Sequence, residues 1–283
     1  MQAALLTTLQ DGRQLAFAEY GERSGRPLLV LHGTPGGRTQ LAALDRPARL
    51  AGVRIIAPDR PGLGYSDPWP ALDFAKYAGD VRQLLDHLQI PRAALAGLSG
   101  GGAFALACAR ELPARISRAI LVAGMAPTPA ALRKAMPLQS RVLFLLSAHC
   151  KWLAAALMKR AYLGDPDSPS LRRTIALMPA ADRRVLERAD VRELLWGAPS
   201  RDSLRQGVDA AIRELALFAQ PLGFDLREIN MPIHLIHGDA DVNVPIEIAR
   251  YLAEQIPGAT LKVIAGAGHL FLFESPQLMF EFA

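Results

Sequence analysis

The feature that most constrains the fold is a glycine-rich turn between an apolar strand and a helix. Ala93–Leu98 is a short run of small and apolar residues, typical of a strand buried on both faces. The strand ends in Gly97-Leu98-Ser99-Gly100-Gly101, and the helix predicted over Gly100–Glu111 follows at once. Larger side chains in such a tight turn would collide with the neighbouring strand and helix. The segment therefore predicts a strand–turn–helix unit that lifts the Ser99 hydroxyl out of a sheet.

The same alternation of short apolar strands and helices occupies both ends of the chain. Further strands are predicted at Leu15–Tyr20, Pro27–Leu31, Val53–Ala57, Ile116–Val122, Ile233–His237 and Thr260–Ala265, and further helices at Phe74–Leu88, Pro245–Gln255 and from Glu274 to the end. This rhythm predicts an α/β fold with a mostly parallel sheet and helices on both faces.

The rhythm stops in the middle of the chain. Residues 126–220 contain several amphipathic helical stretches and no clear strand. The simplest expectation is one α/β domain made of residues 1–125 and 221–283, interrupted by a helical insertion at 126–220. A chain of 283 residues is long enough to bury a core of that size.

A nucleophilic serine needs a base, and the sequence has six histidines. His269 is favoured because it follows the last strand in a glycine-rich loop, where the imidazole can lie over the serine. It is also the last histidine, as the chain order Ser, Asp, His requires. His234 and His237 share one strand, where a structural role is favoured, and His32 is expected to brace its own loop.

The base must be held in one tautomer by a carboxylate. Asp239 and Asp241 both lie just past the strand Ile233–His237. We favour Asp241 for this role. Asp239 is expected to accept hydrogen bonds from the loop backbone and so to hold the turn.

An attack by Ser99 on a carbonyl group creates an oxyanion, which needs fixed N–H donors. The backbone N–H of Gly100, the residue after the nucleophile, is one expected donor. The second is expected from the loop after Leu31, where we choose the N–H of Thr34 and keep Gly33 as the alternative.

The distribution of charged residues bears on the possible partners of the protein. The net charge is +5, and residues 126–220 hold 15 Lys and Arg against 9 Asp and Glu, a difference of +6. This excess fits either a solvated helical surface or a lid that favours anionic or neutral substrates. The arginines are not interleaved with aromatic residues as in a nucleic-acid groove, so no nucleic-acid partner is predicted.

Composition also bears on cofactors and location. Cys108 and Cys150 are too few for a disulfide framework and lack metal-ligand spacing. The N-terminus has no basic leader, and the apolar stretch Val142–Met158 includes Lys151 and falls short of the roughly 20 residues of a membrane span. We expect a cytoplasmic protein with no membrane span, no cofactor and no metal.

Taken together, these segments resemble the α/β-hydrolase superfamily over essentially the whole chain. The matching motifs, in order, are 32–36, 59–66, 97–101 and 238–245, followed by Gly268-His269. The resemblance implies that Asp241, in the pattern Gly238-x-x-Asp-x-x-x-Pro, is the acid of a catalytic triad. It also implies a helical cap after the sixth strand, matching 126–220, and a structural role for 59–66.

One of these motifs bears on the branch of the superfamily. The run His-Gly-Thr-Pro-Gly at 32–36 is similar to the His-Gly-Gly-Pro-Gly of proline iminopeptidases, with Thr34 in place of the middle glycine. Those enzymes bind a free amino terminus with acidic cap residues, for which Glu214 and Asp209 are candidates. Members with an aspartate nucleophile are disfavoured by serine at position 99.

We therefore predict a serine hydrolase that cleaves a carboxylic ester, lactone or thioester of a small molecule with an apolar acyl group. A proline iminopeptidase-like aminopeptidase, a non-ester reaction on the same triad (C–C hydrolysis, a lyase reaction, acyl transfer) and a non-hydrolytic binder remain alternatives. Apolar residues of 126–220 that could line an acyl pocket or pack the segment itself are Leu143, Phe144, Leu146, Trp152, Leu153, Leu157 and Trp196. Oligomeric state is not predicted.

Overall fold

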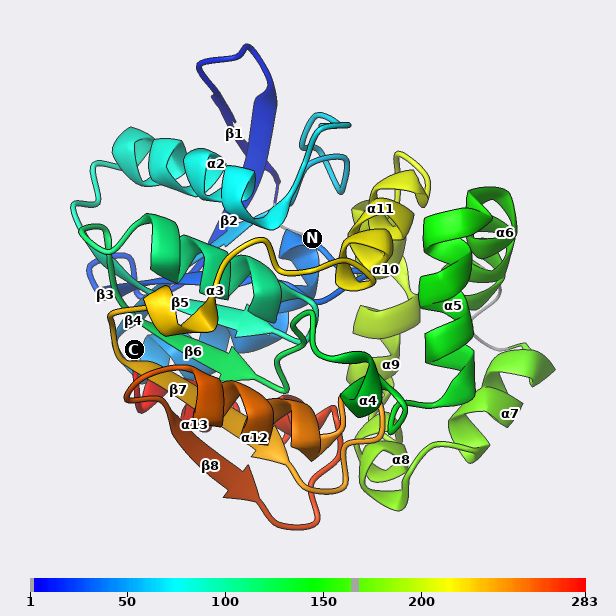
Figure 1. Cartoon of the computed structure of the whole chain (residues 1–283). Helices are drawn as coiled ribbons and strands as arrows, with labels where there is room; N and C mark the ends of the chain where they lie inside the picture. The colour runs from blue at the N-terminus through cyan, green and yellow to red at the C-terminus, as the bar shows by residue number, and fades with distance from the viewer. Residues whose placement is uncertain (1–2, 164–167) are drawn as a thin grey trace.

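The computed structural model describes residues 3–163 and 168–283. Within them, eight strands form one sheet in the order β1-β2-β4-β3-β5-β6-β7-β8 (Figure 1). The strands are β1 (Leu5–Thr8), β2 (Gln14–Gly21), β3 (Arg26–Leu31), β4 (Val53–Pro58), β5 (Ala93–Leu98), β6 (Ile116–Val122), β7 (Ile233–Gly238) and β8 (Thr260–Ile264). Pairs β1–β2 and β2–β4 are antiparallel, and the other pairs are parallel. The predicted α/β fold with a mostly parallel sheet is confirmed.

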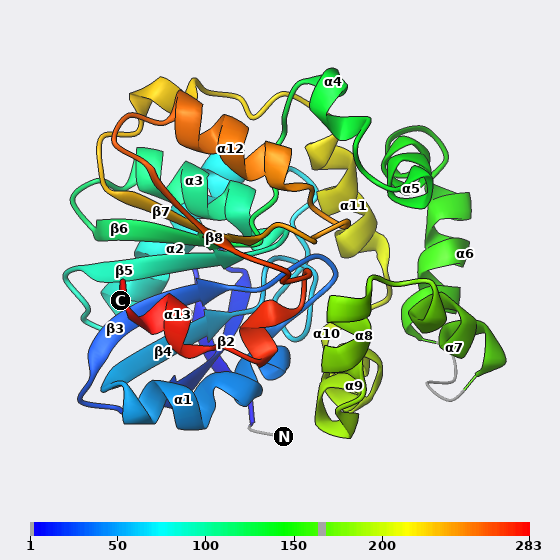
Figure 2. The ribbon, with the colours of Figure 1, turned by 90° about the horizontal axis from the view of Figure 1, so that it is seen from below.

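Helices cover both faces of the sheet because its central strands are apolar on both sides. On one face lie α2 (Phe74–His87), α3 (Gly101–Glu111) and α12 (Ile246–Gln255), and on the other lie α1 (Asp45–Leu50) and α13 (Gln277–Phe280) (Figure 2). Each face has its own buried cluster: Leu29 and Leu95 point into one, and Leu28 and Ala96 into the other.

Three parts of the core differ from the sequence-based expectation. Strand β1 was not predicted, because it is an edge strand with one buried residue and no alternating apolar pattern. The 3₁₀ helix η1 (Arg38–Leu44) and α1 were also not predicted. The last helix, expected from Glu274 to the end, is only the short α13, which begins after Pro276 because a proline is disfavoured inside a helix; the 3₁₀ helix η3 (Phe271–Phe273) precedes it.

Residues 126–220, here called the cap segment, contain helices and, among the residues that the structure describes, no strand. Its helices are α4 (Ala130–Arg133), α5 (Leu138–His149), α6 (Lys151–Tyr162), α7 (Pro169–Ala176), α8 (Ala180–Leu186), α9 (Ala189–Trp196), α10 (Ala198–Ser203) and α11 (Asp209–Phe218). The cap segment lies beside the carboxyl ends of the parallel strands (Figures 1 and 2). Another 3₁₀ helix, η2 (Leu226–Glu228), follows it. Helices of the length and apolarity needed to cross a bilayer do not occur in the described parts of the chain.

Candidate active site

Ser99 lies in the turn between β5 and α3. Its φ of +48° falls in the left-handed region, which non-glycine residues rarely adopt and which costs of order 1–3 kcal/mol. The turn brings strand and helix close together, since a Cβ at Gly97 would lie 2.6 Å from the carbonyl oxygen of Gly101. The Ser99 hydroxyl therefore projects from the end of the sheet at the start of α3, where the helix dipole favours negative charge.

The structure brings Ser99, His269 and Asp241 together from three separate loops. The Ser99 hydroxyl donates to His269 Nε2 over 3.0 Å, and His269 Nδ1 donates to Asp241 Oδ2 over 2.7 Å. These distances are those of a nucleophile beside its base and of a base beside the group that orients it.

The two aspartates considered from the sequence make different contacts. Asp241 Oδ1 accepts from the backbone N–H groups of Asn243 and Val244, each over 2.9 Å, and its Oδ2 faces His269. Asp239 Oδ1 accepts from the N–H of Gly266 over 2.7 Å and so holds the loop that leads to His269.

Charge and burial act together on the pKa values of the pair. Burial alone would raise the Asp241 pKa, but the charge of His269 and hydrogen bonds from His237 and His269 outweigh it and hold that pKa well below 3.8. Burial lowers the His269 pKa, but Asp241, and to a lesser extent Asp182, raise it above 6.5. His269 therefore binds a proton more readily than an ordinary imidazole.

The backbone N–H groups of Gly100, Thr34 and Gly33 lie beside Ser99, and none of the three donates to a protein acceptor within residues 3–163 and 168–283. Gly100 and Thr34 are in close contact: a Cβ at Gly100 would lie 3.0 Å from Thr34 N and 2.5 Å from Thr34 Oγ1. Free N–H groups at this position can donate to an oxyanion formed at Ser99.

A buried ion pair lies behind Thr34. Arg60 and Glu214 are both fully buried, and Arg60 Nε and Nη2 donate to Glu214 over 2.6 and 2.8 Å. The Thr34 hydroxyl donates to Glu214 Oε2 over 2.6 Å and accepts from Arg60 Nη2 over 3.0 Å. Glu214 belongs to α11, so an acid of the cap segment fixes the side chain of Thr34.

Arg60 also fixes the rest of this loop. It donates to the carbonyl oxygens of His32 and Gly33. His32 Nδ1 bonds Gly33 O over 2.8 Å, and its Nε2 accepts from Arg60 N over 3.3 Å. Burial, and then the Arg60 charge, hold the His32 pKa well below 6.5, so this histidine stays neutral and braces the loop.

Two further acids of the cap segment reach the core. Asp182, on α8, accepts from the N–H of Leu270, next to His269, over 2.8 Å. Asp202, on α10, forms a 3.1 Å ion pair with Arg38, which also pairs with Asp59. The motif 59–66 implied a structural role for the loop that contains Arg60 but named no partner for it, and no sequence pattern pointed to Asp182, because the partners of both residues lie far away in the chain.

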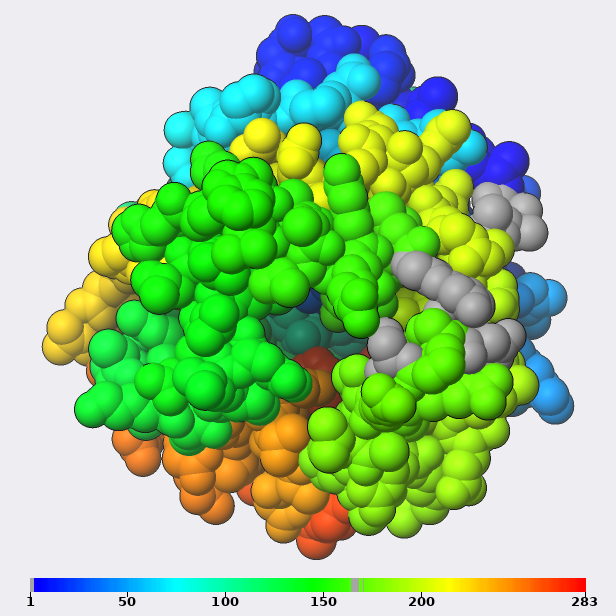
Figure 3. All heavy atoms as spheres, turned by 90° about the vertical axis from the view of Figure 1, so that its right-hand side faces the viewer, coloured from blue at the N-terminus to red at the C-terminus, as the bar shows by residue number. Residues whose placement is uncertain are grey.

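The site is open to solvent. Ser99 and His269 are both partly exposed. Figure 3 shows the cap side of the molecule hollowed between the helices of residues 130–163 and those further along the cap segment, with atoms of the core at the floor. Of the expected pocket residues, Trp152 and Leu157 instead face solvent, Phe144 stacks on Phe218, and Trp196 packs within the cap segment.

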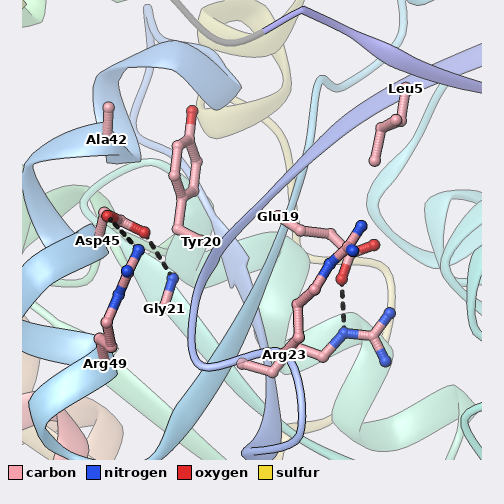
Figure 4. A pocket seen from close by; sticks show the side chains of 9 residues that line it. Leu5, Glu19, Tyr20, Gly21, Arg23, Ala42, Asp45 and Arg49 are labelled. Carbon is pink, nitrogen blue, oxygen red and sulfur yellow. Dashed lines mark hydrogen bonds and ion pairs between the residues drawn. The ribbon is translucent and has the colours of Figure 1, made fainter.

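A second pocket, of about 520 Å³, lies away from the triad and is lined by residues of β1, β2, β4 and α1 (Figure 4). Its acids are already paired, Glu19 with Arg54 and Asp45 with Arg49. In the described part of the chain, His, Cys, Asp and Glu side chains do not gather in threes as a metal site would require.

Comparison with known proteins agrees with this architecture. A family model described as "Alpha/beta hydrolase family" matches residues 28–282. The non-heme chloroperoxidase of Streptomyces lividans is 29% identical over 96% of this chain and 95% of its own length. The AB hydrolase superfamily protein YisY of Bacillus subtilis is 27% identical over 89% of this chain and 88% of its own.

Solved structures give the same result. A thermophilic esterase from Thermogutta terrifontis superimposes with a TM-score of 0.65 at 26% identity, covering 99% of this chain and 96% of that one. The resemblance inferred from the motifs is confirmed, as is the prediction of a hydrolase. With a family match over most of its length, the chain belongs to the α/β hydrolase family of enzymes.

Proposed function

We propose that the protein is a serine hydrolase that cleaves a carboxylic ester of a small molecule through an acyl-enzyme. The observation on which the proposal rests is the hydrogen-bonded chain from Ser99 Oγ through His269 to Asp241. A fixed base beside a serine hydroxyl can remove the hydroxyl proton while the serine oxygen attacks a carbonyl carbon.

In the proposed reaction, Ser99 Oγ bonds to the carbonyl carbon while its proton passes to His269 Nε2. The negative carbonyl oxygen accepts hydrogen bonds from the N–H groups of Gly100 and Thr34. His269 then gives the proton to the leaving alkoxide as the ester bond breaks. A water molecule, deprotonated by His269, releases the acid and restores Ser99. Asp241 stabilises the imidazolium at each stage.

Two considerations favour an ester over an amino-terminal peptide substrate. The relative from Thermogutta terrifontis is an esterase. In addition, Glu214, a candidate for binding a substrate amino group, is buried against Arg60 and Thr34, and Asp209, the other candidate, is exposed at the start of α11. Neither candidate is therefore a free buried carboxylate that could bind a substrate amino group.

The test compares p-nitrophenyl esters of increasing acyl length with proline p-nitroanilide. Ser99→Ala should lower kcat on the esters by on the order of 10⁶-fold, because the nucleophile is lost. Ser24→Ala, at an exposed serine, is the matched control and should keep full activity. Ester cleavage that survives Ser99→Ala would refute the mechanism. Preferential cleavage of the anilide would identify an aminopeptidase instead.

A further inference from the structure

The first part of the cap segment has an extreme charge distribution. Residues 126–163 contain six Lys and Arg and no Asp or Glu, a net charge of +6, whereas the whole chain has +5. The rest of the cap segment, residues 164–220, holds nine basic and nine acidic residues and so has no net charge. The helices α4, α5 and α6 and the turns between them therefore carry a net charge of +6, whereas the rest of the chain together has a net charge of −1.

Most of these cations have no acidic partner among the residues that the structure describes, and Arg133 donates to the carbonyl oxygen of Thr128. Five of the six are exposed and, among the described residues, have no acidic partner: Lys134, Arg141, Lys151, Lys159 and Arg160. Arginines later in the cap segment do pair, as Arg184 does with Glu274 and Arg188 with Asp190. Four of the five, all except Lys134, lie on α5 and α6, and such a group of cations can act on an anionic partner outside the molecule.

Large apolar side chains are exposed on the same two helices. On α5, Leu138, Val142 and Leu145 are spaced four and three residues apart and so share one face, on which Leu138 is 69% and Leu145 58% exposed. On α6, Trp152 is 74% exposed. Such side chains normally lie in a core, and their exposure on two helices that contact each other indicates an interaction site.

We infer that this helix pair, α5 with α6, is a docking face for an anionic lipid surface. Basic residues mixed with Trp and Leu on exposed helices are typical of segments that lie in the bilayer interface. Each helix has 12 residues, too few to span a bilayer, so the face lies on the membrane surface. The lipid phosphates would form ion pairs with the exposed cations. The side chains of Trp152 and Leu138 would insert between the headgroups and the acyl chains.

The position of the face agrees with this role. The hollow above the core opens on the side of the molecule that presents the residue 130–163 helices (Figure 3). Docking through α5 and α6 would therefore turn the opening of the site towards the membrane. A second copy of the chain is a poorer occupant, because a two-fold dimer would place the +6 segment against itself.

Binding is measured by flotation of the Ser99→Ala protein with phosphatidylcholine vesicles, with and without phosphatidylglycerol. This variant separates docking from the proposed chemistry, since it keeps the face and lacks the nucleophile. We expect binding to the vesicles that contain phosphatidylglycerol, weakened by added salt because charge attraction is screened. Absence of binding to these vesicles would overturn the inference, whether or not the enzyme is an esterase.

Charge variants test which surface binds. The triple change Lys151→Gln, Lys159→Gln and Arg160→Gln should weaken binding about 100-fold, since each cation near an anionic surface contributes about 1 kcal/mol. The matched control removes three exposed arginines elsewhere: Arg23→Gln, Arg46→Gln and Arg92→Gln. An equal loss of vesicle binding in both triple variants would mean that binding depends on net charge alone, and the assignment of the face would be wrong.

Apolar variants complete the test. Trp152→Ser should weaken binding about ten-fold, while Leu50→Ser, at an 80% exposed leucine of α1, should not. Unchanged thermal unfolding shows that each variant is folded. If sedimentation instead reveals a dimer that Trp152→Ser dissociates, and vesicles do not bind, the face belongs to a second copy and the lipid inference fails.

Discussion

His269 owes its orientation to a carboxylate that the chain has already fixed. Two backbone N–H groups hold Asp241 Oδ1, which leaves Oδ2 to accept from His269 Nδ1. His237 Nε2 lies 3.3 Å from the same oxygen and donates over 2.7 Å to the carbonyl of Val244. With its pKa held low, Asp241 stays ionised throughout the neutral range and keeps raising the pKa of His269.

This arrangement predicts a specific pH dependence. Only neutral His269 can take the Ser99 proton, so kcat/KM should fall as pH drops through the His269 pKa, at a midpoint above 6.5. Asp241→Asn removes the negative charge that raises this pKa. The midpoint should then move to lower pH, and the plateau should fall about 10⁴-fold because the tautomer is no longer fixed.

The pH profile of p-nitrophenyl ester hydrolysis measures both effects. Asp239→Asn is the matched control, because Asp239 contacts the N–H of Gly266 and not the imidazole. It should leave the midpoint in place. An acid limb that does not move in Asp241→Asn would show that another group controls it.

At the scale of elements, most strands and helices of the core were predictable, except β1, η1, α1 and the last helix, and the contacts of the cap segment were not. The run Ala93–Leu98 and the turn after it depend on neighbours in sequence, so local pattern identifies them. The Arg60–Glu214 pair joins residues 154 positions apart, and no local rule supplies such a partner. One signal was available: Glu214 lies among the apolar residues of α11, where a carboxylate needs a cation.

The buried pair predicts an uneven response to mutation. Glu214→Ala leaves the Arg60 charge buried without a partner and should lower the free energy of unfolding by about 3–5 kcal/mol. The double change Arg60→Met with Glu214→Leu should recover most of the loss, because no unpaired charge remains. Asp209→Ala, at an exposed acid of the same helix, should stay within about 0.5 kcal/mol of wild type. Urea unfolding measures all three, and equal effects of Glu214→Ala and Asp209→Ala would contradict this account.

On the scale of the whole molecule, three acids of the cap segment join it to the core near the site. Asp182 holds the backbone beside His269, Asp202 pairs with Arg38, and Glu214 pairs with Arg60. The apolar contacts are shared as well, because Phe218 of α11 packs against Phe74 of the core in one continuous buried cluster. Three acids of this basic segment therefore face the core, whereas its exposed cations on α5 and α6 face away from it.

Because these ion pairs, hydrogen bonds and apolar contacts join the two parts, we expect the cap segment and the core to unfold together, even though many chains of this size unfold in stages. The three tryptophans allow a direct measurement, since Trp69 lies in the core and Trp152 and Trp196 in the cap segment. One variant keeps Trp69 alone and a second keeps Trp196 alone, with phenylalanine at the other two positions. Fluorescence of both should change at the same urea concentration as the circular dichroism signal. An earlier transition for Trp196 would mean that residues 126–220 open as a separate unit, and that their buried acids do not bind them firmly to the loops of the site.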